Sequence, residues 1–313
     1  MDNSPSVSVV IPNYNGGLFV ERAIRSALDQ NYPSLDIIVA DDGSTDDSLD
    51  TLRRWVPTIT LSAGRNSGAC VARNRGLALS RAEFVLFLDA DDTLDPGYVQ
   101  LLASAATEHV DLVVGGHRHL GSNGEVLRTV SYRPGESCVA LLSDFLHENV
   151  QTGAVLWRRS WLLERGGWNE TLPMFQDVEV MIRALLARPR VRVIDPGPLR
   201  AIWHEHDAPD RITNSFRRDK AEAVLGVLDE NATAIITMGG ARAKQGLTHH
   251  YYMLARRAFG ARHDDVGRRA LRSARALGLR GHQGSLAHCV LSTLVGLRLK
   301  TQIGRLAGRV RYT

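Results

Sequence analysis

The 313-residue sequence has little of what marks several protein classes. Its cysteines are few, far apart and odd in number, which argues against a disulfide framework or a thiolate zinc site: Cys70, Cys138 and Cys289. No apolar run approaches the roughly 20 residues that a membrane-spanning helix needs. The first strand-like run begins at Val7, too early for a secretion signal to precede it. These features predict a globular protein in a reducing compartment.

Two common phosphate-binding patterns are also missing. No Gly-x-x-x-x-Gly-Lys-Ser/Thr sequence occurs, which excludes the usual P-loop, and no Gly-x-Gly-x-x-Gly follows a strand, which excludes the usual dinucleotide-binding turn. If the protein binds a phosphorylated nucleotide, a metal ion must hold the phosphates. Arg65, Arg73 and Arg75 could add contacts, although exposed arginines on a helix are the commoner case.

Charge is divided unevenly along the chain. Residues 1–214 hold 20 Lys and Arg against 28 Asp and Glu, whereas residues 215–313 hold 18 against 6. Between Leu254 and Arg280, arginines alternate with apolar residues as they do in basic amphipathic helices. Such helices can bind an anionic membrane surface; the alternative is a helical domain whose arginines are solvated or pair with acidic groups. No recognised nucleic-acid-binding motif is found, so we expect no nucleic-acid partner.

Apolar runs alternate with segments of helical spacing over the first 115 residues, which indicates an α/β fold. The predicted strands lie at residues 7–11, 36–40, 58–61, 83–88 and 111–115. One helix is expected to begin at a cap formed by Ser44 or Thr45. Another is expected to begin with Asp95 as N-cap and Pro96 at the first helical position.

The pattern changes after Gly116. The sequence Gly121-Ser122-Asn123-Gly124 between two β-prone runs predicts a hairpin, so the sheet becomes mixed. Helices are expected at about 138–147 and 177–187, and further strands at about 153–157, 191–194 and 199–203. From Phe216 onward almost everything has helical spacing.

Acidic residues directly follow two of the predicted strands: Asp41 and Asp42, then Asp89, Asp91 and Asp92. Ligands of open α/β sheets bind at the carboxyl ends of strands, where these side chains are expected. Carboxylates so close together repel one another unless a cation neutralises them, and oxygen ligands suit Mg²⁺ or Mn²⁺. The alternative for both clusters is a turn that caps the next helix.

Four motifs in order closely resemble the pattern of glycosyltransferase family 2: Val9-Val10-Ile11-Pro12-Asn13-Tyr14-Asn15, Ala40-Asp41-Asp42-Gly43-Ser44-Thr45-Asp46, Asn66-Ser67-Gly68 with Ala72-Arg73-Asn74-Arg75-Gly76, and Leu88-Asp89-Ala90-Asp91-Asp92. The likeness covers about residues 6–206 and includes Thr152-Gly153, Gly166-Gly167-Trp168-Asn169-Glu170 and Gln176-Asp177. It implies a GT-A fold, a Rossmann-like mixed sheet flanked by helices. It also implies a catalytic domain at 1–214, with a nucleotide-sugar half at about 1–116 and an acceptor half at about 117–214, before a basic helical region at 215–313.

The resemblance implies roles for single residues in binding a nucleoside diphosphate sugar. Pro12 and Tyr14 would line the base pocket, and Asp41 would accept a hydrogen bond from the base, commonly uracil. The other expected substrate-binding residues are Arg73, Asp89, Gly166, Gly167 and Trp168. The family often has a histidine near His204 and His206, two side chains that share one face of a strand. The expected ligands of Mn²⁺ or Mg²⁺ are therefore Asp91, Asp92 and His206, with two loop histidines as the alternative.

The likeness also makes Asp177 the expected general base of an inverting transfer, in which it removes the proton of an acceptor hydroxyl that attacks the anomeric carbon. The family usually has Glu-Asp here, and this chain has Gln176 in place of the glutamate. The departure keeps the base and removes a neighbouring negative charge. The acceptor would be a glycan, a glycolipid or another hydroxyl compound, as in cell-surface polysaccharide synthesis.

Two other functions fit parts of the sequence. A sugar-phosphate nucleotidyltransferase also places acidic metal ligands on an α/β nucleotide fold, but the Gly-rich, arginine-bearing loop expected near its N-terminus is missing. A catalytically silent nucleotide-sugar-binding protein is compatible with Gln176. We expect a cytoplasmic location, or a peripheral one on the inner face of the membrane through the basic helices.

Overall fold

The computed structural model of the chain describes residues 4–17, 19–135, 137–148, 151–206, 216–281, 283, 292 and 296–306. It consists of two compact units. The first comprises residues 1–141, 149–171 and 176–208, and the second comprises residues 142–148, 172–175 and 209–313. The assignment of a catalytic domain to residues 1–214, with two functional halves, stays a prediction, because compactness does not show which residues carry an activity.

A seven-stranded sheet forms the centre of the first unit. Its strands are β1 (Val7–Asn13), β2 (Leu35–Asp41), β3 (Thr60–Ala63), β4 (Phe84–Phe87), β6 (Leu112–Val114), β9 (Val155–Arg158) and β10 (Val191–Val193). They lie in the order β10-β6-β9-β4-β1-β2-β3. β1 to β4 run parallel, and β9 is antiparallel to both β4 and β6, so the sheet is mixed as predicted.

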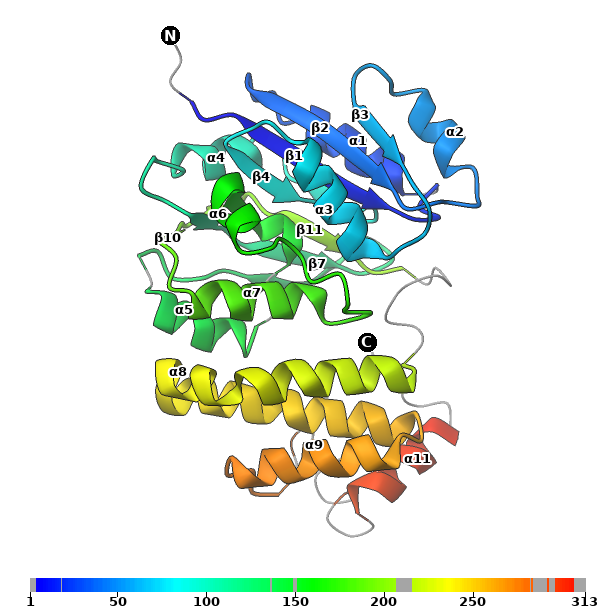
Figure 1. Cartoon of the computed structure of the whole chain (residues 1–313), viewed down its shortest axis with the longest axis vertical. Coiled ribbons are helices and arrows are strands. Elements are labelled where there is room, and N and C mark those ends of the chain that lie inside the picture. Colours follow the sequence, from blue (N-terminus) through cyan, green and yellow to red (C-terminus); the bar gives the residue numbers. More distant parts are fainter. Residues whose placement is uncertain are drawn as a thin grey trace. The chain divides into compact units, whose positions relative to one another are not determined.

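Helices cover both faces of this sheet (Figure 1), which explains why β1 and β4 are buried along their whole length. Helix α3 (Ala69–Leu79) packs on β1 so closely that a Cβ atom at Gly76 would lie 2.3 Å from Cγ1 of Val10. The other helices of the unit are α1 (Val20–Leu28), α2 (Ser48–Arg53), α4 (Tyr98–Ser104), α6 (Arg159–Glu164) and α7 (Gln176–Leu186), with a 3-10 turn at Thr152–Ala154.

A smaller four-stranded sheet has the order β5-β11-β7-β8. Its strands are β5 (Thr93–Leu94), β7 (His117–Leu120), β8 (Val126–Val130) and β11 (Ala201–His204). β7 and β8 form the predicted hairpin, which the backbone N–H of Gly121 closes by donating to the carbonyl of Glu125 at 2.9 Å. The two-residue strand β5 was not predicted, because so short a run gives no periodic signal.

The predicted cap of helix α2 is wrong. The helix begins at Ser48, after Asp47, and neither Ser44 nor Thr45 caps it. The hydroxyl of Ser44 instead donates to Oδ2 of Asp41 at 2.6 Å. A contact at the end of strand β2 therefore replaces the local cap.

The predicted start of helix α4 is also wrong. The helix begins at Tyr98, after Gly97 in a left-handed conformation with φ of 84°. Oδ2 of Asp95 accepts a hydrogen bond of 2.9 Å from the backbone N–H of Arg200, and Arg118 lies 3.6 Å from the same carboxylate. Asp95 thus holds the small sheet together instead of capping a helix.

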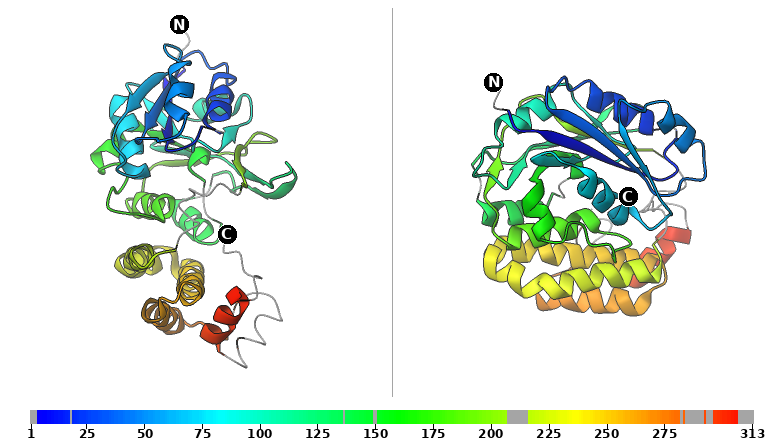
Figure 2. Two further views of the ribbon diagram at one scale, coloured as in Figure 1. Left: turned by 90° about the vertical axis from the view of Figure 1, so that its right-hand side faces the viewer. Right: turned by 45° about the horizontal axis from the view of Figure 1, so that its top comes forward.

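The second unit is built from α8 (Arg218–Gly260), α9 (Asp264–Ala276) and α11 (Leu297–Leu306). Gly240 has non-helical backbone angles inside α8, and the hydroxyl of Tyr251 donates to Asp229 at 2.7 Å. On a straight helix, Asp229 and Tyr251 would lie about 33 Å apart. α8 therefore doubles back at Gly240, and Figure 2 shows its two halves and α9 side by side. The helix α5 (Cys138–Phe145) has residues in both units.

The apolar residues of the basic helices are turned into this second unit. Leu254, Phe259 and Val266 are buried, whereas Arg268 and Arg272 are exposed. At these three positions the amphipathic pattern reflects packing between helices, as in the alternative of a helical domain, and binding to a membrane surface stays a prediction. Of the helices in the described residues, none combines the length and the apolar character that crossing a bilayer requires.

Candidate active site

The two acidic clusters lie at one edge of the large sheet. β1 pairs in parallel with β2, where Asn13 is opposite Asp41, and with β4, where Val10 is opposite Phe87. Because the carboxyl ends of parallel strands meet at the same edge, the residues that follow β2 and β4 come out on the same side of the sheet. The arrangement that the sequence predicted for these clusters is present.

Asp41 is fully buried, and protein groups occupy its carboxylate. Oδ1 accepts the backbone N–H groups of Gly43 and Ser44 at 3.1 and 3.0 Å. Oδ2 accepts the side-chain amide of Asn13 at 2.8 Å and the Ser44 hydroxyl. A carboxylate offers about four acceptor positions, and all are used here. The geometry therefore favours a structural role for Asp41 over the hydrogen bond to a nucleotide base that the resemblance implied.

Asp42 was noted in the sequence without a role, and it too is buried. Oδ2 accepts the backbone N–H of Gly68 at 2.7 Å, and both oxygens lie 3.1 Å from the backbone nitrogen of Ser67. Arg75 approaches the same carboxylate at 3.3 Å. Asp42 thus fixes the loop that leads into helix α3, and Arg75 pairs with it instead of lying exposed.

The other two residues expected at the base pocket lie at the end of β1. Pro12 is buried in the strand, opposite Ala40. Tyr14 follows the strand and is 43% exposed, among the more exposed large apolar side chains of the described residues. An exposed aromatic ring at the carboxyl edge of a sheet can stack on a planar ligand.

Arg73 connects Asp89, in the acidic cluster after β4, to Gln176, the chain neighbour of the expected base. One terminal nitrogen donates to Asp89 at 2.7 Å, and the other donates to Oε1 of Gln176 at 2.9 Å. The guanidinium also lies over the ring of Trp168, 4.5 Å from its centroid. Arg73 is only 7% exposed, so these protein groups, and not solvent, surround its charge. This supports a positioning role more directly than contact with a substrate.

Asp91 and His206, two of the expected metal ligands, contact each other directly. Oδ2 of Asp91 lies 2.7 Å from Nε2 of His206, and the carboxylate is 28% exposed. Arg22 holds the backbone carbonyl of Asp91 at 2.7 Å, and Phe19 lies against the imidazole with 4.4 Å between ring centroids. The pair therefore has a fixed orientation and access to solvent.

Asp92 differs from its neighbours because it is fully buried. Its carboxylate accepts the side-chain amide of Gln151 and the backbone N–H of His204, the latter at 3.2 Å. Burial raises the pKa of Asp92 well above its ordinary value, and the nearby carboxylates of Asp91 and Asp89 add to the rise. The geometry favours a role in holding β11 over the metal-binding role expected from the sequence.

His204 has a different partner from His206. Its Nε2 lies 2.8 Å from the hydroxyl of Thr93 on the neighbouring strand β5. Burial lowers the pKa of His204 to about 4, with a contribution from the charge of Arg22, so the ring is neutral at physiological pH. Of the two histidines, His206 is the one beside Asp91.

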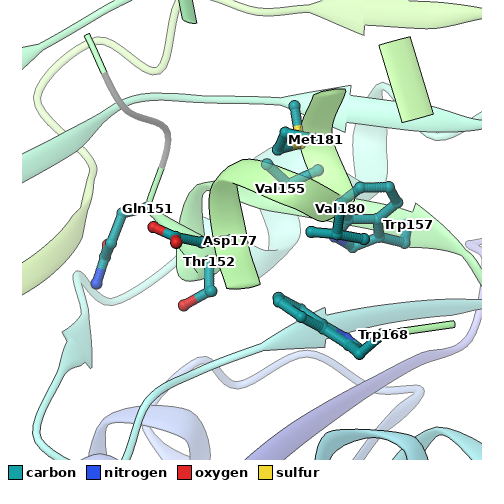
Figure 3. A pocket seen from close by; sticks show the side chains of 8 residues that line it. All are labelled: Gln151, Thr152, Val155, Trp157, Trp168, Asp177, Val180 and Met181. Atoms are coloured by element: carbon teal, nitrogen blue, oxygen red, sulfur yellow. The ribbon is translucent and has the colours of Figure 1, made fainter. Parts of the chain in front are cut away.

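Asp177 lies in the first turn of α7, at the edge of a small pocket (Figure 3). The pocket is lined by Gln151, Thr152, Val155, Trp157, Trp168, Asp177, Val180 and Met181. Burial raises the pKa of Asp177 and Asp89 adds to this, whereas the backbone N–H of Val178 and the charge of Arg73 act in the opposite direction. A raised pKa makes an ionised carboxylate a stronger base.

Three polar atoms of the pocket have no hydrogen-bond partner among the described residues: Gln151 Oε1, Thr152 Oγ1 and Trp168 Nε1. Trp168 and Thr152 are 2% and 8% exposed, so bulk water does not compensate for the missing partners. A ligand hydroxyl could both donate and accept hydrogen bonds at this place. The sequence motif marked Thr152 and Trp168 but gave no sign that they share a pocket.

The two glycines before Trp168 shape its loop. Gly166 and Gly167 have φ of 79° and 64°, a region that glycine adopts without strain. A Cβ atom on Gly167 would lie 2.4 Å from Oδ1 of Asn74. Asn74 in turn binds the backbone of Trp168 twice at 2.8 Å, at its N–H and at its carbonyl. Gly166 and Gly167 thus act by giving the loop the backbone conformation that positions Trp168.

Within the described residues, no group of three or more His, Cys, Asp and Glu side chains is arranged to hold a metal ion. The protein donors at the carboxyl edge are instead a pair, Asp91 and His206, near Asp89. A carboxylate with an imidazole suits Mn²⁺, and divalent cations in nucleotide sites take further ligands from phosphate oxygens and water. The donor set therefore fits a cation that arrives with a diphosphate.

Comparisons with known proteins identify relatives of this chain. A segment of 184 residues, 57% of the chain, is 28% identical to chondroitin synthase of Escherichia coli and covers 26% of that protein. The chain thus spans about a quarter of this relative.

Solved structures share the fold over nearly the whole chain. TarS of S. aureus in complex with UDP-GlcNAc matches with a TM-score of 0.67 and 18% identity, over 98% of this chain and 93% of that one. The mannosyltransferase PcManGT of Pyrobaculum calidifontis, in complex with GDP-Man and Mn²⁺, matches with a TM-score of 0.55 and 19% identity, over 98% and 88%.

The predicted fold, a mixed GT-A sheet with a helical C-terminal region, is confirmed by these matches. The family model described as Glycosyl transferase family 2 matches residues 8–163, about half of the chain. This range contains the four motifs and the strands that carry Asp41, Asp89 and Asp91. The chain belongs to glycosyl transferase family 2.

Proposed function

We propose that the protein transfers a sugar from a nucleoside diphosphate sugar to a hydroxyl group of an acceptor, with inversion at the anomeric carbon. The observation that carries the proposal is the bridge formed by Arg73 between Asp89, behind β4, and Gln176, the neighbour of Asp177. This bridge supports a single site that contains both the carboxylates after β4, suited to a diphosphate-bound cation, and Asp177, suited to proton removal.

On the donor side, Asp91 and His206 would hold Mn²⁺ or Mg²⁺. The cation would neutralise the charge that develops on the departing diphosphate. Arg22 and Phe19 keep the pair in place through the Asp91 carbonyl and the His206 ring. Asp89 would contact the ribose or the cation, and its hydrogen bond with Arg73 would hold it in position.

On the acceptor side, Asp177 would take the proton of the attacking hydroxyl. Its pKa is raised, so the ionised form binds a proton more readily than an exposed aspartate does. Thr152 and Trp168 offer hydrogen-bonding atoms in the same pocket that no described protein group uses. These atoms would orient the hydroxyl before it reacts.

The donor is proposed to be a UDP-sugar. The match to TarS in complex with UDP-GlcNAc supports this base, while the match to PcManGT with GDP-Man makes GDP-sugars the comparison to test. Tyr14, exposed at the carboxyl edge, would stack on the base, and Pro12 would support it from the buried strand. Asp41 would act through Asn13 and Ser44 instead of touching the base.

The acceptor is proposed to be a growing cell-surface glycan or a glycolipid, reached from the cytoplasmic side. The likeness to chondroitin synthase supports a polysaccharide role. In the proposed division, residues 1–214 carry catalysis and residues 215–313 form the basic helical region. Exposed arginines such as Arg268 and Arg272 could bind an anionic membrane surface by charge alone.

The proposal is tested by incubating the full chain with glycan acceptors and a panel of UDP- and GDP-sugars, with Mn²⁺ or with EDTA, and measuring the release of nucleoside diphosphate. We expect Mn²⁺-dependent release of UDP from one or a few donors. Release of pyrophosphate from a sugar phosphate and a nucleoside triphosphate would instead identify a nucleotidyltransferase. Binding of a donor without turnover, in the presence of glycan acceptors, would contradict transfer.

A further inference from the structure

The contacts of Arg73 give Gln176 a function that its sequence position alone does not show. Gln176 lies at the start of α7 and is buried, and its side-chain carbonyl accepts from Arg73 at 2.9 Å. The same guanidinium donates to Asp89 at 2.7 Å. The buried guanidinium of Arg73 therefore donates to a neutral amide on one side and to a carboxylate on the other.

The charges around Asp177 can be counted from the elements that pack near it. Helix α3 contributes Arg73 and Cys70, and burial raises the pKa of the Cys70 thiol to about 11, so only Arg73 is charged. The loop after β4 contributes Asp89. On α7 itself, Glu179 pairs with Arg183 at 2.7 Å.

This count leaves one cation, Arg73, and one further carboxylate, Asp89, whose charges act on Asp177. A glutamate at position 176 would add a third carboxylate within hydrogen-bond distance of Arg73, next to Asp177 in the chain. In a poorly solvated site such a charge favours protonation of its neighbours. The amide accepts the same hydrogen bond without adding charge.

We propose that Gln176 is a positioning residue whose neutral amide lets Arg73 balance Asp89 and Asp177 together, so that Asp177 stays ionised and ready to accept a proton. The inference rests on the proposed role of Asp177 as the base. Its physical core, the effect of position 176 on the ionisation of Asp177, holds independently of which donor and acceptor are used.

The test is an NMR titration of the full chain labelled with ¹³C in the carboxyl groups of aspartate. The Asp177 signal is assigned by its absence from the Asp177→Asn spectrum. In Gln176→Glu, we expect the apparent pKa of Asp177 to rise by about one pH unit relative to the wild type. The matched control is Gln100→Glu, the same substitution at an exposed position of α4, which should leave that pKa unchanged.

An apparent pKa of Asp177 that is the same in Gln176→Glu and in the wild type would overturn the inference. If Gln176→Glu does not fold, Arg73→Gln decides, because loss of the guanidinium should also raise the pKa of Asp177 and an unchanged value contradicts the proposal. Where transfer is measurable, the acidic limb of the pH profile of kcat should move to higher pH in Gln176→Glu. A titration shift without any transfer activity would support the inference and count against the proposed function.

Discussion

The two units of the chain differ in where their charged side chains lie and in how many partners these have. At the carboxyl edge of the large sheet, several charged groups are buried and have more than one protein partner, as Arg73 has with Asp89, Gln176 and Trp168. In the helical unit, ion pairs lie on the surface, as between Glu222 and Arg269. A buried charge that loses its partner is costly, whereas an exposed pair contributes little. Comparing substitutions in the two units therefore distinguishes a site held by specific buried contacts from a solvated surface.

The largest contrast is expected in catalysis. Asp177→Asn keeps the shape of the side chain but cannot take up the proton, so transfer should fall by about 10²–10⁴-fold. Binding of the nucleoside diphosphate, measured by calorimetry, should persist. The control from the other unit is Glu222→Gln, which should leave the transfer rate unchanged. Transfer by Asp177→Asn at near wild-type rates would show that Asp177 is not the base.

The next contrast concerns stability. Asp42→Ala removes the acceptor of the Ser67 and Gly68 backbone N–H groups and the partner of Arg75. Because the two backbone N–H groups would lose this acceptor, and Arg75 would keep only the Asp41 carbonyl of these contacts, we expect the free energy of unfolding to fall by about 1–3 kcal/mol. Urea unfolding of the variant measures this. A loss below about 1 kcal/mol would show that solvent replaces the carboxylate and that the edge is less closed than the contacts indicate.

A smaller effect is expected from the ionisation of Asp177 itself. Its pKa is raised in the folded chain, so the ionised form opposes folding once the pH exceeds that value, and this cost is absent at low pH. Asp177→Asn should therefore have a higher Tm than the wild type at pH 8, and the gap should shrink toward pH 4. Differential scanning calorimetry at both pH values checks the sign. A gap that grows at low pH would contradict it.

The smallest effect belongs to the surface of the helical unit. Arg269→Ala breaks an exposed pair with Glu222 whose members are both partly solvated. The free energy of unfolding should change by no more than about 0.5–1 kcal/mol, again in urea. A loss as large as that of Asp42→Ala would mean that the helical unit also depends on specific charge pairs.

The sequence allowed the strands and their polar ends to be predicted because these depend on local patterns. The apolar run at 84–88 and the carboxylates behind it carry their own signal. The caps at Ser44 and Asp95 failed for the opposite reason. Each side chain accepts a hydrogen bond from a backbone N–H that the fold brings to it: Ser44 from Asn15, 29 positions away, and Asp95 from Arg200, 105 positions away.

The roles inside the site depend even more on distant pairing. Asp91 and Asp92 are neighbours in sequence, yet one faces His206 and the other is enclosed by Gln151 and the backbone of His204. Local sequence cannot distinguish them, because the distinction is made by β11, more than a hundred residues later. The motif located the cluster, and the fold assigns each carboxylate its surroundings.

The most direct test of the account is a calorimetric titration of UDP, with and without Mn²⁺, into the wild type and Asp91→Asn. If Asp91 and His206 hold the cation that carries the diphosphate, the wild type should bind UDP tightly only with Mn²⁺, and Asp91→Asn should lose at least about tenfold in affinity, or 1.4 kcal/mol. Tight binding of UDP that neither Mn²⁺ nor the substitution changes would contradict the account.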